Sequence, residues 1–215
     1  MVRKANRFYS SSLKVRKRYI LFFCLLAVFF CARDLCAHPH VFIDTRVIVV
    51  FDQKGISGFR IEWEFDEMFS AMIIQDFDED YDSFFSIAEI ENIEQNAFSN
   101  LKNFHYFTYI SWKGGEYDGN RIEDFYAAIS GGTLIYRFFV PCRLSVDDKE
   151  KEVRVWVYDD SYYCDVGYAE NAPVNIEGAE GYSLRYEIVK DESIEYYYGQ
   201  VCPLQLRLLF GKNDD

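Results

Sequence analysis

An acidic stretch of twelve residues, 78–89, constrains the fold of this chain more than any other part of its sequence. Carboxylates stand at positions one, three and five of the stretch, and a glutamate stands at position twelve. This is the spacing by which a helix–loop–helix calcium site directs about six to eight oxygens at one ion, with a backbone carbonyl at position seven and a side-chain or water ligand at position nine. The expected calcium ligands are Asp78, Asp80, Asp82, Phe84, Ser86 and Glu89.

One position of this stretch departs from the calcium pattern. Position six, where the chain turns sharply and glycine is expected because it adopts a positive φ easily, is Ser83. A serine there costs about 1 kcal/mol of backbone strain, so we expect a weakened site and not a lost one. The alternative interpretation is an acidic surface loop that binds no ion.

Helical patterns flank the loop on both sides. Asp66 can cap a helix that runs to Asp76. From Ile87, apolar residues recur at three- and four-residue steps, which predicts a second helix to about Lys102. Helix, acidic loop and helix in this order are the context that the calcium motif requires. The chain holds no second copy of the motif, so the predicted site is unpaired.

On both sides of residues 66–102 the pattern predicts β-structure. The run 41–51 is rich in β-branched residues, and residues 59–65 alternate between apolar and polar, so the two form a hairpin about the turn at 52–55. A second hairpin is expected about Gly131-Gly132. Further strands are expected at 104–112, 122–129, 133–140, 153–158, 162–166, 174–176, 182–188 and 201–210. We therefore predict an α+β fold, mainly antiparallel β-sheet or sandwich, with an EF-hand-like helix–loop–helix inserted at about residues 66–102.

The first 37 residues have the pattern of an export signal. Residues 1–18 hold seven basic residues and no acid, residues 19–32 form an apolar run, and Cys36-Ala37 supplies small residues before His38. This order predicts a signal peptide at 1–37, cleaved after Ala37, because the apolar run is too short to span a bilayer comfortably. A single domain at 38–215 with no transmembrane segment would remain. The alternative is an uncleaved N-terminal anchor.

Charge and motifs narrow the class of function. Residues 38–215 carry 15 basic and 34 acidic residues, a net charge of −19, which repels nucleic acid and anionic lipid and attracts cations. Half of the full chain is apolar and 19% is aromatic, so this is no disordered acidic tail. The sequence holds no nucleophile elbow, triad signature, phosphate loop or zinc-hydrolase helix. We expect a protein that is not an enzyme and binds no nucleic acid.

The start of the predicted mature chain offers a second candidate metal site. His38 and His40, with the α-amine that cleavage would free, can hold nickel, cobalt, copper or zinc. Pro39 has no amide N–H, which excludes the square-planar N-terminal chelate, and Asp44 is a candidate further ligand. The alternative is that His-Pro-His packs against or caps the first strand. His105 is interpreted as a strand or loop residue.

Two further groups of residues leave their role open. Cys142, Cys164 and Cys202 permit one disulfide and one free thiol, and the sequence does not choose the pair. Tyrosines near three aspartates suggest either a ligand pocket or, as we expect, aromatic core residues whose hydroxyls reach the edge. These residues are Tyr158, Asp159, Asp160, Tyr162, Tyr163 and Asp165.

Several stretches resemble a family of bacterial periplasmic proteins of unknown function, the DUF1007 family. They are 38–44, 63–70, the acidic loop, 106–109 and 157–163, in order over nearly all of 38–215. Members are labelled the periplasmic component of an uncharacterised ABC-type transport system and tend to be encoded beside nickel/cobalt-type permeases. The resemblance therefore implies a periplasmic location and a membrane metal permease as partner. The family usually has glycine where this chain has Ser83.

These observations together favour a periplasmic accessory or metal-binding component of a divalent-metal transport system. Ca²⁺ would bind the acidic loop, and Ni²⁺, Co²⁺ or Zn²⁺ would bind His38 and His40. One alternative is a calcium-stabilised interaction module without a transported ligand. Another is a carboxylate-dependent hydrolase, for which the sequence offers only its abundance of acids.

Overall fold

The computed structural model describes residues 22, 39–117, 119–146 and 150–213. From residue 39 on, they belong to one compact unit, His38–Asp215. The predicted signal peptide lies outside the described residues, apart from Phe22. Among the described residues, no helix is both long enough and apolar enough to cross a membrane.

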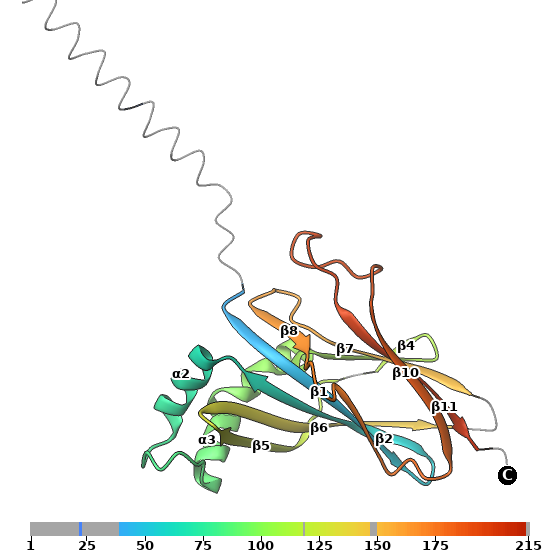
Figure 1. Cartoon of the computed structure of the whole chain (residues 1–215), viewed down its shortest axis with the longest axis horizontal. Coiled ribbons are helices and arrows are strands. Elements are labelled where there is room, and N and C mark those ends of the chain that lie inside the picture. Colours follow the sequence, from blue (N-terminus) through green and yellow to red (C-terminus); the bar gives the residue numbers. More distant parts are fainter. Residues whose placement is uncertain (1–21, 23–38, 118, 147–149, 214–215) are drawn as a thin grey trace, which may run out of the picture. The chain divides into compact units, whose positions relative to one another are not determined.

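The compact unit is built from two β-sheets and a short helical insert (Figure 1). One sheet has six strands in the order β5-β6-β2-β1-β8, with β9 also paired to β1, and the other has the order β10-β11-β7-β3-β4. The strands are β1 (Val41–Asp52), β2 (Gly55–Phe65), β3 (Thr108–Trp112), β4 (Gly115–Tyr117), β5 (Glu123–Ser130), β6 (Thr133–Ser145), β7 (Lys151–Val157), β8 (Cys164–Tyr168), β9 (Val174–Glu177), β10 (Tyr182–Lys190) and β11 (Leu204–Lys212). The insert contains α2 (Glu67–Phe77), α3 (Ile87–Asn96) and the 3₁₀ segment η2 (Phe98–Phe107). A β-rich α+β fold is therefore confirmed.

Both predicted hairpins are present. β1 and β2 pair antiparallel up to Asp52 and Gly55, and β5 and β6 pair up to Ser130 and Thr133, on either side of Gly131-Gly132. Gly131 and Gly132 have φ of 62° and 89°, which only glycine adopts without strain. Local turn chemistry thus fixes the register of these four strands.

The sheets are mainly antiparallel, as predicted, and the exception is at β1. β1 pairs parallel with β8 and with β9, Val41 opposite Cys164 and Val47 opposite Val174. Residues 53–163, which include strands of the other sheet, connect β1 to β8. Parallel strands need a long connection of this kind. The alternation of apolar residues along one strand does not show whether its partner is parallel or antiparallel.

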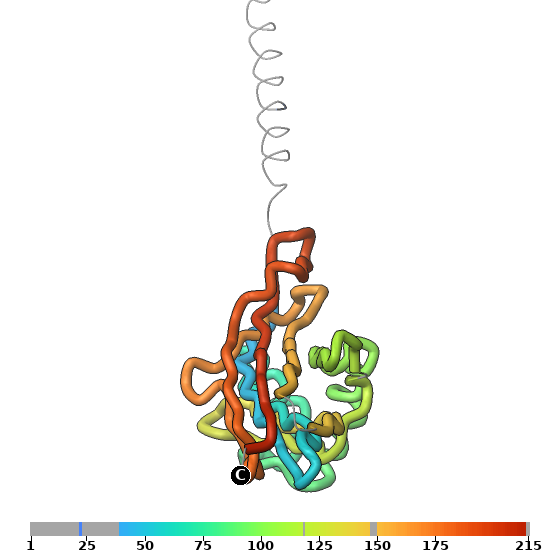
Figure 2. The backbone as a smooth tube through the Cα atoms, turned by 90° about the vertical axis from the view of Figure 1, so that its right-hand side faces the viewer, coloured from blue at the N-terminus to red at the C-terminus, as the bar shows by residue number. Residues whose placement is uncertain are grey.

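The two sheets share one hydrophobic core. The Phe51 ring of β1 lies edge-on to Phe210 of β11, with centroids 5.6 Å apart, and Tyr182 of β10 donates a 3.0 Å hydrogen bond to the Asp52 carbonyl. Figure 2 shows β10 and β11, in orange to red, on one side of the unit and the green part of the insert on the other. Residues from both sheets and from the insert therefore meet in a single interior.

Four predicted boundaries are wrong. The second helix ends at Asn96 and not near Lys102, because the chain continues as the 3₁₀ segment η2. The following strand begins at Thr108 and not at 104, because the chain turns through left-handed conformations at His105, Tyr106 and Phe107. The last strand begins at Leu204, after Pro203, since proline cannot donate to a ladder. β8 begins at Cys164, two residues later than expected, after Tyr162 adopts a φ of 57°.

Candidate functional site

Helix α2 is joined to the sheet at its N-cap residue, Asp66. The Asp66 side chain caps the helix, because its Oδ1 accepts hydrogen bonds from the backbone N–H groups of Met68 and Phe69, both at 2.9 Å. Its Oδ2 accepts a third hydrogen bond, at 2.8 Å, from the N–H of Phe42 in β1. The cap was expected from the sequence. The bond to β1 was not.

A second link from α2 to the sheet was missed by sequence reasoning. Ser70 is fully buried, and its Oγ accepts a 2.9 Å hydrogen bond from the backbone N–H of Leu134 in β6. The same hydroxyl donates to the Phe65 carbonyl at 3.3 Å. A serine on an otherwise apolar helix face was the only signal for it. The start of the insert is thus held by both β1 and β6.

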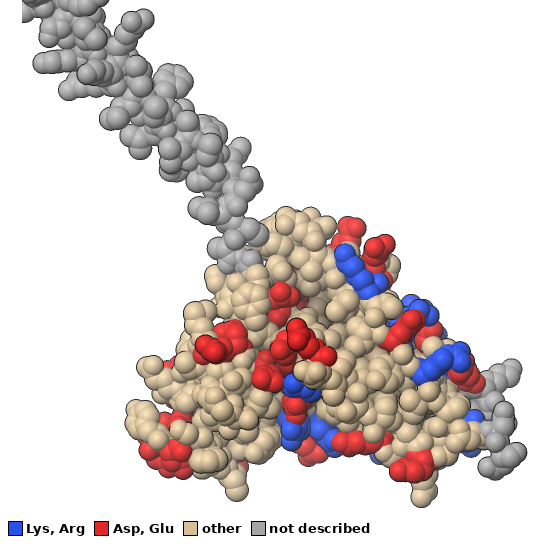
Figure 3. Space-filling model, viewed as in Figure 1, with Lys and Arg blue, Asp and Glu red and all other residues tan. Residues whose placement is uncertain are grey.

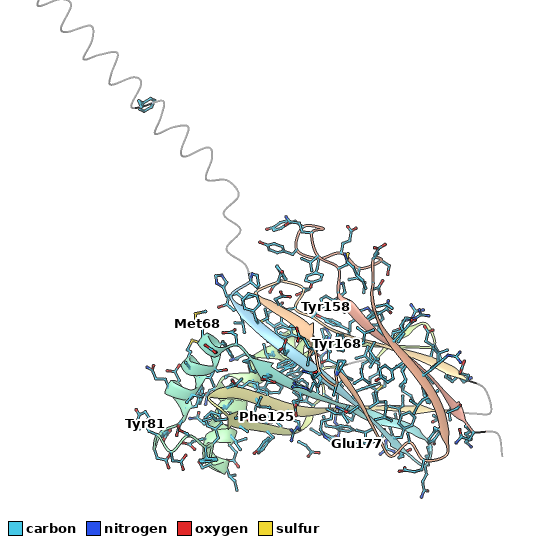
Figure 4. The ribbon with its side chains drawn as sticks, viewed as in Figure 1. Met68, Tyr81, Phe125, Tyr158, Tyr168 and Glu177 are labelled. Atoms are coloured by element: carbon cyan, nitrogen blue, oxygen red, sulfur yellow. The ribbon has the colours of Figure 1, made fainter. Side chains whose placement is uncertain are left out.

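Three carboxylates converge in the loop between α2 and α3. Asp78, Asp80 and Asp82 each place one oxygen so that the three atoms lie within 4.8 Å of one another. Asp78 is buried, with 3% of its surface exposed, while the other two are exposed. Asp78 accepts hydrogen bonds from the N–H groups of Asp82 (3.2 Å) and Ser83 (3.1 Å), which curl the loop around it. Acidic side chains gather at this end of the molecule (Figure 3), where Tyr81 projects outward (Figure 4).

Two residues of the loop have left-handed backbone conformations. Ser83 has a φ of 66°, so position six is left-handed as predicted, with a serine in place of glycine. Tyr81 is left-handed as well, at 59°. Phe84 donates its N–H to Asp82 Oδ1 at 2.8 Å, and 69% of its surface is exposed. The strain expected at Ser83 is therefore present in the fold.

Glu89 serves the backbone at the start of α3. Its Oε1 accepts a 2.8 Å hydrogen bond from the N–H of Glu79, and its Oε2 accepts one of 2.7 Å from the N–H of Ser86. Ser86 Oγ in turn accepts from the N–H of Glu89, which completes a capping box. The hydrogen bonds from Ser86, backbone first, and from Glu79 lower the pKa of Glu89. Of the six expected ligands, the structure brings three side chains together and holds two others at the helix start.

The histidines form no such cluster in the described part of the chain. His38 lies outside the described residues, and His40 is exposed, with its ring 5.0 Å from that of Tyr163. Asp44 is exposed on β1, two residues beyond the exposed Phe42. His105 is left-handed, and its ring lies 5.5 Å from Tyr109. Among the described residues, the three loop aspartates are the one group of three or more His, Cys, Asp or Glu side chains placed to share an ion.

Of the three aspartates that lie near tyrosines, Asp159 has a structural role. Asp159 is buried and accepts hydrogen bonds from Ser161, through its N–H at 3.0 Å and its hydroxyl at 2.7 Å, and from the Cys164 N–H at 2.9 Å. Its carboxylate thus shapes the turn into β8. Cys142, Cys164 and Cys202 are all free thiols, and burial raises the pKa of Cys142 and of Cys164 to about 12. Neither of these two is a thiolate at neutral pH.

The sequence did not reveal a cavity between the first sheet and the insert. It has a volume of about 470 Å³ and its walls come from β1, β2, β6, α2, the segment after α3 and the turn before β8. Phe69 and Ala97 line it from the insert, Tyr163 from the turn and Cys164 from the start of β8. The wall residues are far apart in the chain, so no single stretch of sequence signals the cavity.

Comparison with known proteins identifies the family. Residues 22–196 match the model of DUF1007, described as a protein of unknown function, and the chain belongs to this family. It is 29% identical over 131 residues to an uncharacterized 15.5 kDa protein in the trpE 3' region of Spirochaeta aurantia, covering 61% of this chain and 93% of the relative. It is 25% identical over 205 residues to an uncharacterized protein of Haemophilus influenzae, covering 90% of this chain and 91% of the relative.

Proposed function

We propose that this chain is a divalent-cation-binding protein whose loop 78–89 is an EF-hand-like site for Ca²⁺. The observation that carries the proposal is the convergence of Asp78, Asp80 and Asp82 within 4.8 Å. Three like charges this close repel one another, and a hard divalent cation that takes oxygen ligands relieves the repulsion. The left-handed Ser83 supports the same interpretation, since this is the turn the motif needs.

The cation would tie the two helices of the insert together. Asp78 directly follows α2, and Glu89 lies in the first turn of α3, so ligands from this loop connect the end of one helix to the start of the next. The loop could bind the cation with either of two sets of ligands. In one, the three aspartates bind alone and Glu89 keeps its bonds to Ser86 and Glu79. In the other, Glu89 exchanges those N–H donors for the ion.

Calorimetric titration with Ca²⁺ and Mg²⁺ tests the site. The Asp80→Asn variant removes one charge from the aspartate cluster, and Glu79→Gln is its matched control, since it removes one charge from the neighbouring residue outside the ligand set. We expect sub-millimolar Ca²⁺ binding, weakened at least tenfold by Asp80→Asn and about twofold or less by Glu79→Gln. Glu89→Gln separates the two ligand sets, because only the second loses affinity strongly.

Two results would count against the site. Equal losses in Asp80→Asn and Glu79→Gln would show general electrostatic attraction by an acidic surface and no ligand geometry. Tight binding that survives a triple Asp78, Asp80 and Asp82 replacement by Asn would place the ion elsewhere.

The wider role that we propose follows from the family resemblance. The chain would be a periplasmic accessory component that works with a membrane permease in the transport of a divalent metal such as Ni²⁺, Co²⁺ or Zn²⁺. His38 and His40 are the candidate ligands for this metal. A His40→Ala variant tests this part separately from the loop. If Ni²⁺ and Co²⁺ bind no better than at millimolar concentration, or bind His40→Ala equally well, the transition-metal site at the histidines is wrong while the Ca²⁺ site stands.

A further inference from the structure

A second cavity lies on the sheet that contains β3 and β7, on the face turned away from the core. Tyr109 of β3 and Trp156 of β7 are direct partners, so their side chains lie on the same face, and both line the cavity. The next pair, Ile110 and Val155, belongs to the hydrophobic core and therefore lies on the opposite face. The volume of about 730 Å³ is within the range of roughly 300–1,000 Å³ that ligand pockets occupy.

Aromatic residues form a large part of the wall of this cavity, and the structure holds them in place. Tyr158, labelled in Figure 4, directly follows β7, and its ring lies 4.7 Å from that of Tyr109. The Trp156 indole is fixed by a 3.0 Å hydrogen bond from its Nε1 to the buried Asp191 carboxylate. Tyr117 of β4 lines the cavity as well, with 37% of its surface exposed. A ligand therefore meets an aromatic wall that is formed before it binds.

The charges at this cavity are negative. Among the described residues, its wall contains one carboxylate, Glu116, and one imidazole, His105, and it contains no lysine or arginine. Burial and then the carboxylates of Asp160 and Glu116 raise the pKa of Tyr158. Both carboxylates therefore act on the aromatic wall, and their field favours a cation in the cavity.

The basic residues of this part of the chain line a neighbouring cavity. They are Lys113, Lys151 and Arg154. Arg154 pairs with Glu152, and Lys113 Nζ lies 5.3 Å from the centre of the Trp112 ring, so these two cations have partners outside the wall of the aromatic cavity. A ligand in the aromatic cavity thus meets one carboxylate and several rings, and no ammonium or guanidinium group of its described wall.

We propose that this cavity binds a small organic ammonium ion. The faces of tyrosine and tryptophan rings attract such cations, most strongly where water is displaced, and Glu116 gives the field in the cavity its sign. An anion would lose its hydration and find no cation in this wall. A hard metal ion needs about six oxygen ligands, which one carboxylate does not supply. The site is separate from the loop 78–89, and its test does not depend on Ca²⁺.

Two matched probes, choline and 3,3-dimethyl-1-butanol, test the proposal on the intact protein by calorimetric titration. They have the same shape and differ in one atom, the charged nitrogen of choline against a neutral carbon. The titrations are done in about 0.15 M KCl, which screens attraction between exposed charges. We expect choline to bind at sub-millimolar concentration and at least about tenfold more tightly than the alcohol.

Two pairs of variants locate the bound choline. Tyr109→Leu removes a ring from the wall and should weaken choline binding at least about fivefold, whereas Tyr109→Phe keeps the ring and should change it by about twofold or less. Glu116→Gln removes the carboxylate of the wall and should weaken binding at least about threefold. Glu170→Gln is its matched control, because Glu170 is exposed and lies outside the cavity wall, and it should have almost no effect.

Three results would overturn the proposal. The first is a failure of choline to bind at about 1 mM, and the second is equal binding of choline and the alcohol. The third is an equal loss in Glu116→Gln and Glu170→Gln, which would show general attraction by an acidic surface. If Tyr109→Leu does not fold, the two probes and the two glutamate variants still decide, because Glu116 and Glu170 are both exposed.

Discussion

Replacing Ser70 by alanine should destabilise the fold although only one oxygen is removed. Ser70 is fully buried and its Oγ is the hydrogen-bond acceptor for the N–H of Leu134, itself fully buried at the second residue of β6. In Ser70→Ala this N–H is left without its partner, which costs roughly 1–3 kcal/mol. The bond to the Phe65 carbonyl is long, at 3.3 Å, and adds little. We expect a loss of about 2 kcal/mol.

Urea unfolding measures this loss. With a slope of about 2 kcal/mol per molar urea for a domain of this size, the midpoint should fall by about 1 M, and the melting temperature by about 4–8 °C. Ser99→Ala is the matched control, because Ser99 is exposed and its hydroxyl donates only to the Gln95 carbonyl one turn earlier. It should change stability by less than about 0.5 kcal/mol.

The reasoning would be refuted by equal midpoints for the two variants. It would also fail if Ser70→Ala lowered the slope but not the midpoint, since that result would indicate a changed denatured state and no lost contact.

The remaining predictions concern the insert and one turn. Asp66→Ala should cost about 1–2 kcal/mol in urea unfolding, and Asp66→Asn should cost less, because its amide oxygen still caps α2 while its NH₂ cannot accept from Phe42. The lowered pKa of Glu89 means that its contribution to stability is present above its ordinary pKa and is lost as the pH falls through the lowered value; acid titration followed by circular dichroism should show a weaker dependence in Glu89→Gln. Gly55→Ala should cost at least about 2 kcal/mol in thermal unfolding, since its φ is 140° and a Cβ would lie 2.2 Å from the Leu144 carbonyl oxygen.

The sequence predicted those parts of the fold that depend on neighbouring residues. The Asp66 cap, the turn at Gly131-Gly132, the left-handed Ser83 and the two helices around the loop all follow from chemistry within a few residues. Such features have short-range causes, so one stretch of sequence contains them in full.

What the sequence did not predict depends on long-range packing or, at Glu89, on two roles that one local pattern allows. The bond from Ser70 to Leu134 joins residues in elements whose contact no periodicity specifies. The use of Glu89 as a capping-box residue competes with its use as a ligand, and the two give the same pattern of residue types. The cavity wall likewise forms only when distant strands meet, as at Trp63 of β2 and Tyr136 of β6, which are direct partners in the sheet.

The parallel pairing of β1 also bears on how the chain acquires its structure. β2 follows β1 at once, but the other edge of β1 pairs with β8 and β9, and Val41 meets Cys164 across more than half of the chain. Until those residues are synthesised, β1 presents an open strand edge, which is a template for aggregation. Contacts of such sequence separation also slow folding, because the closure of the long intervening segment precedes any gain from it. Chains that end before β8 therefore keep this edge exposed, and folding of this domain completes only after the last third of the chain has emerged.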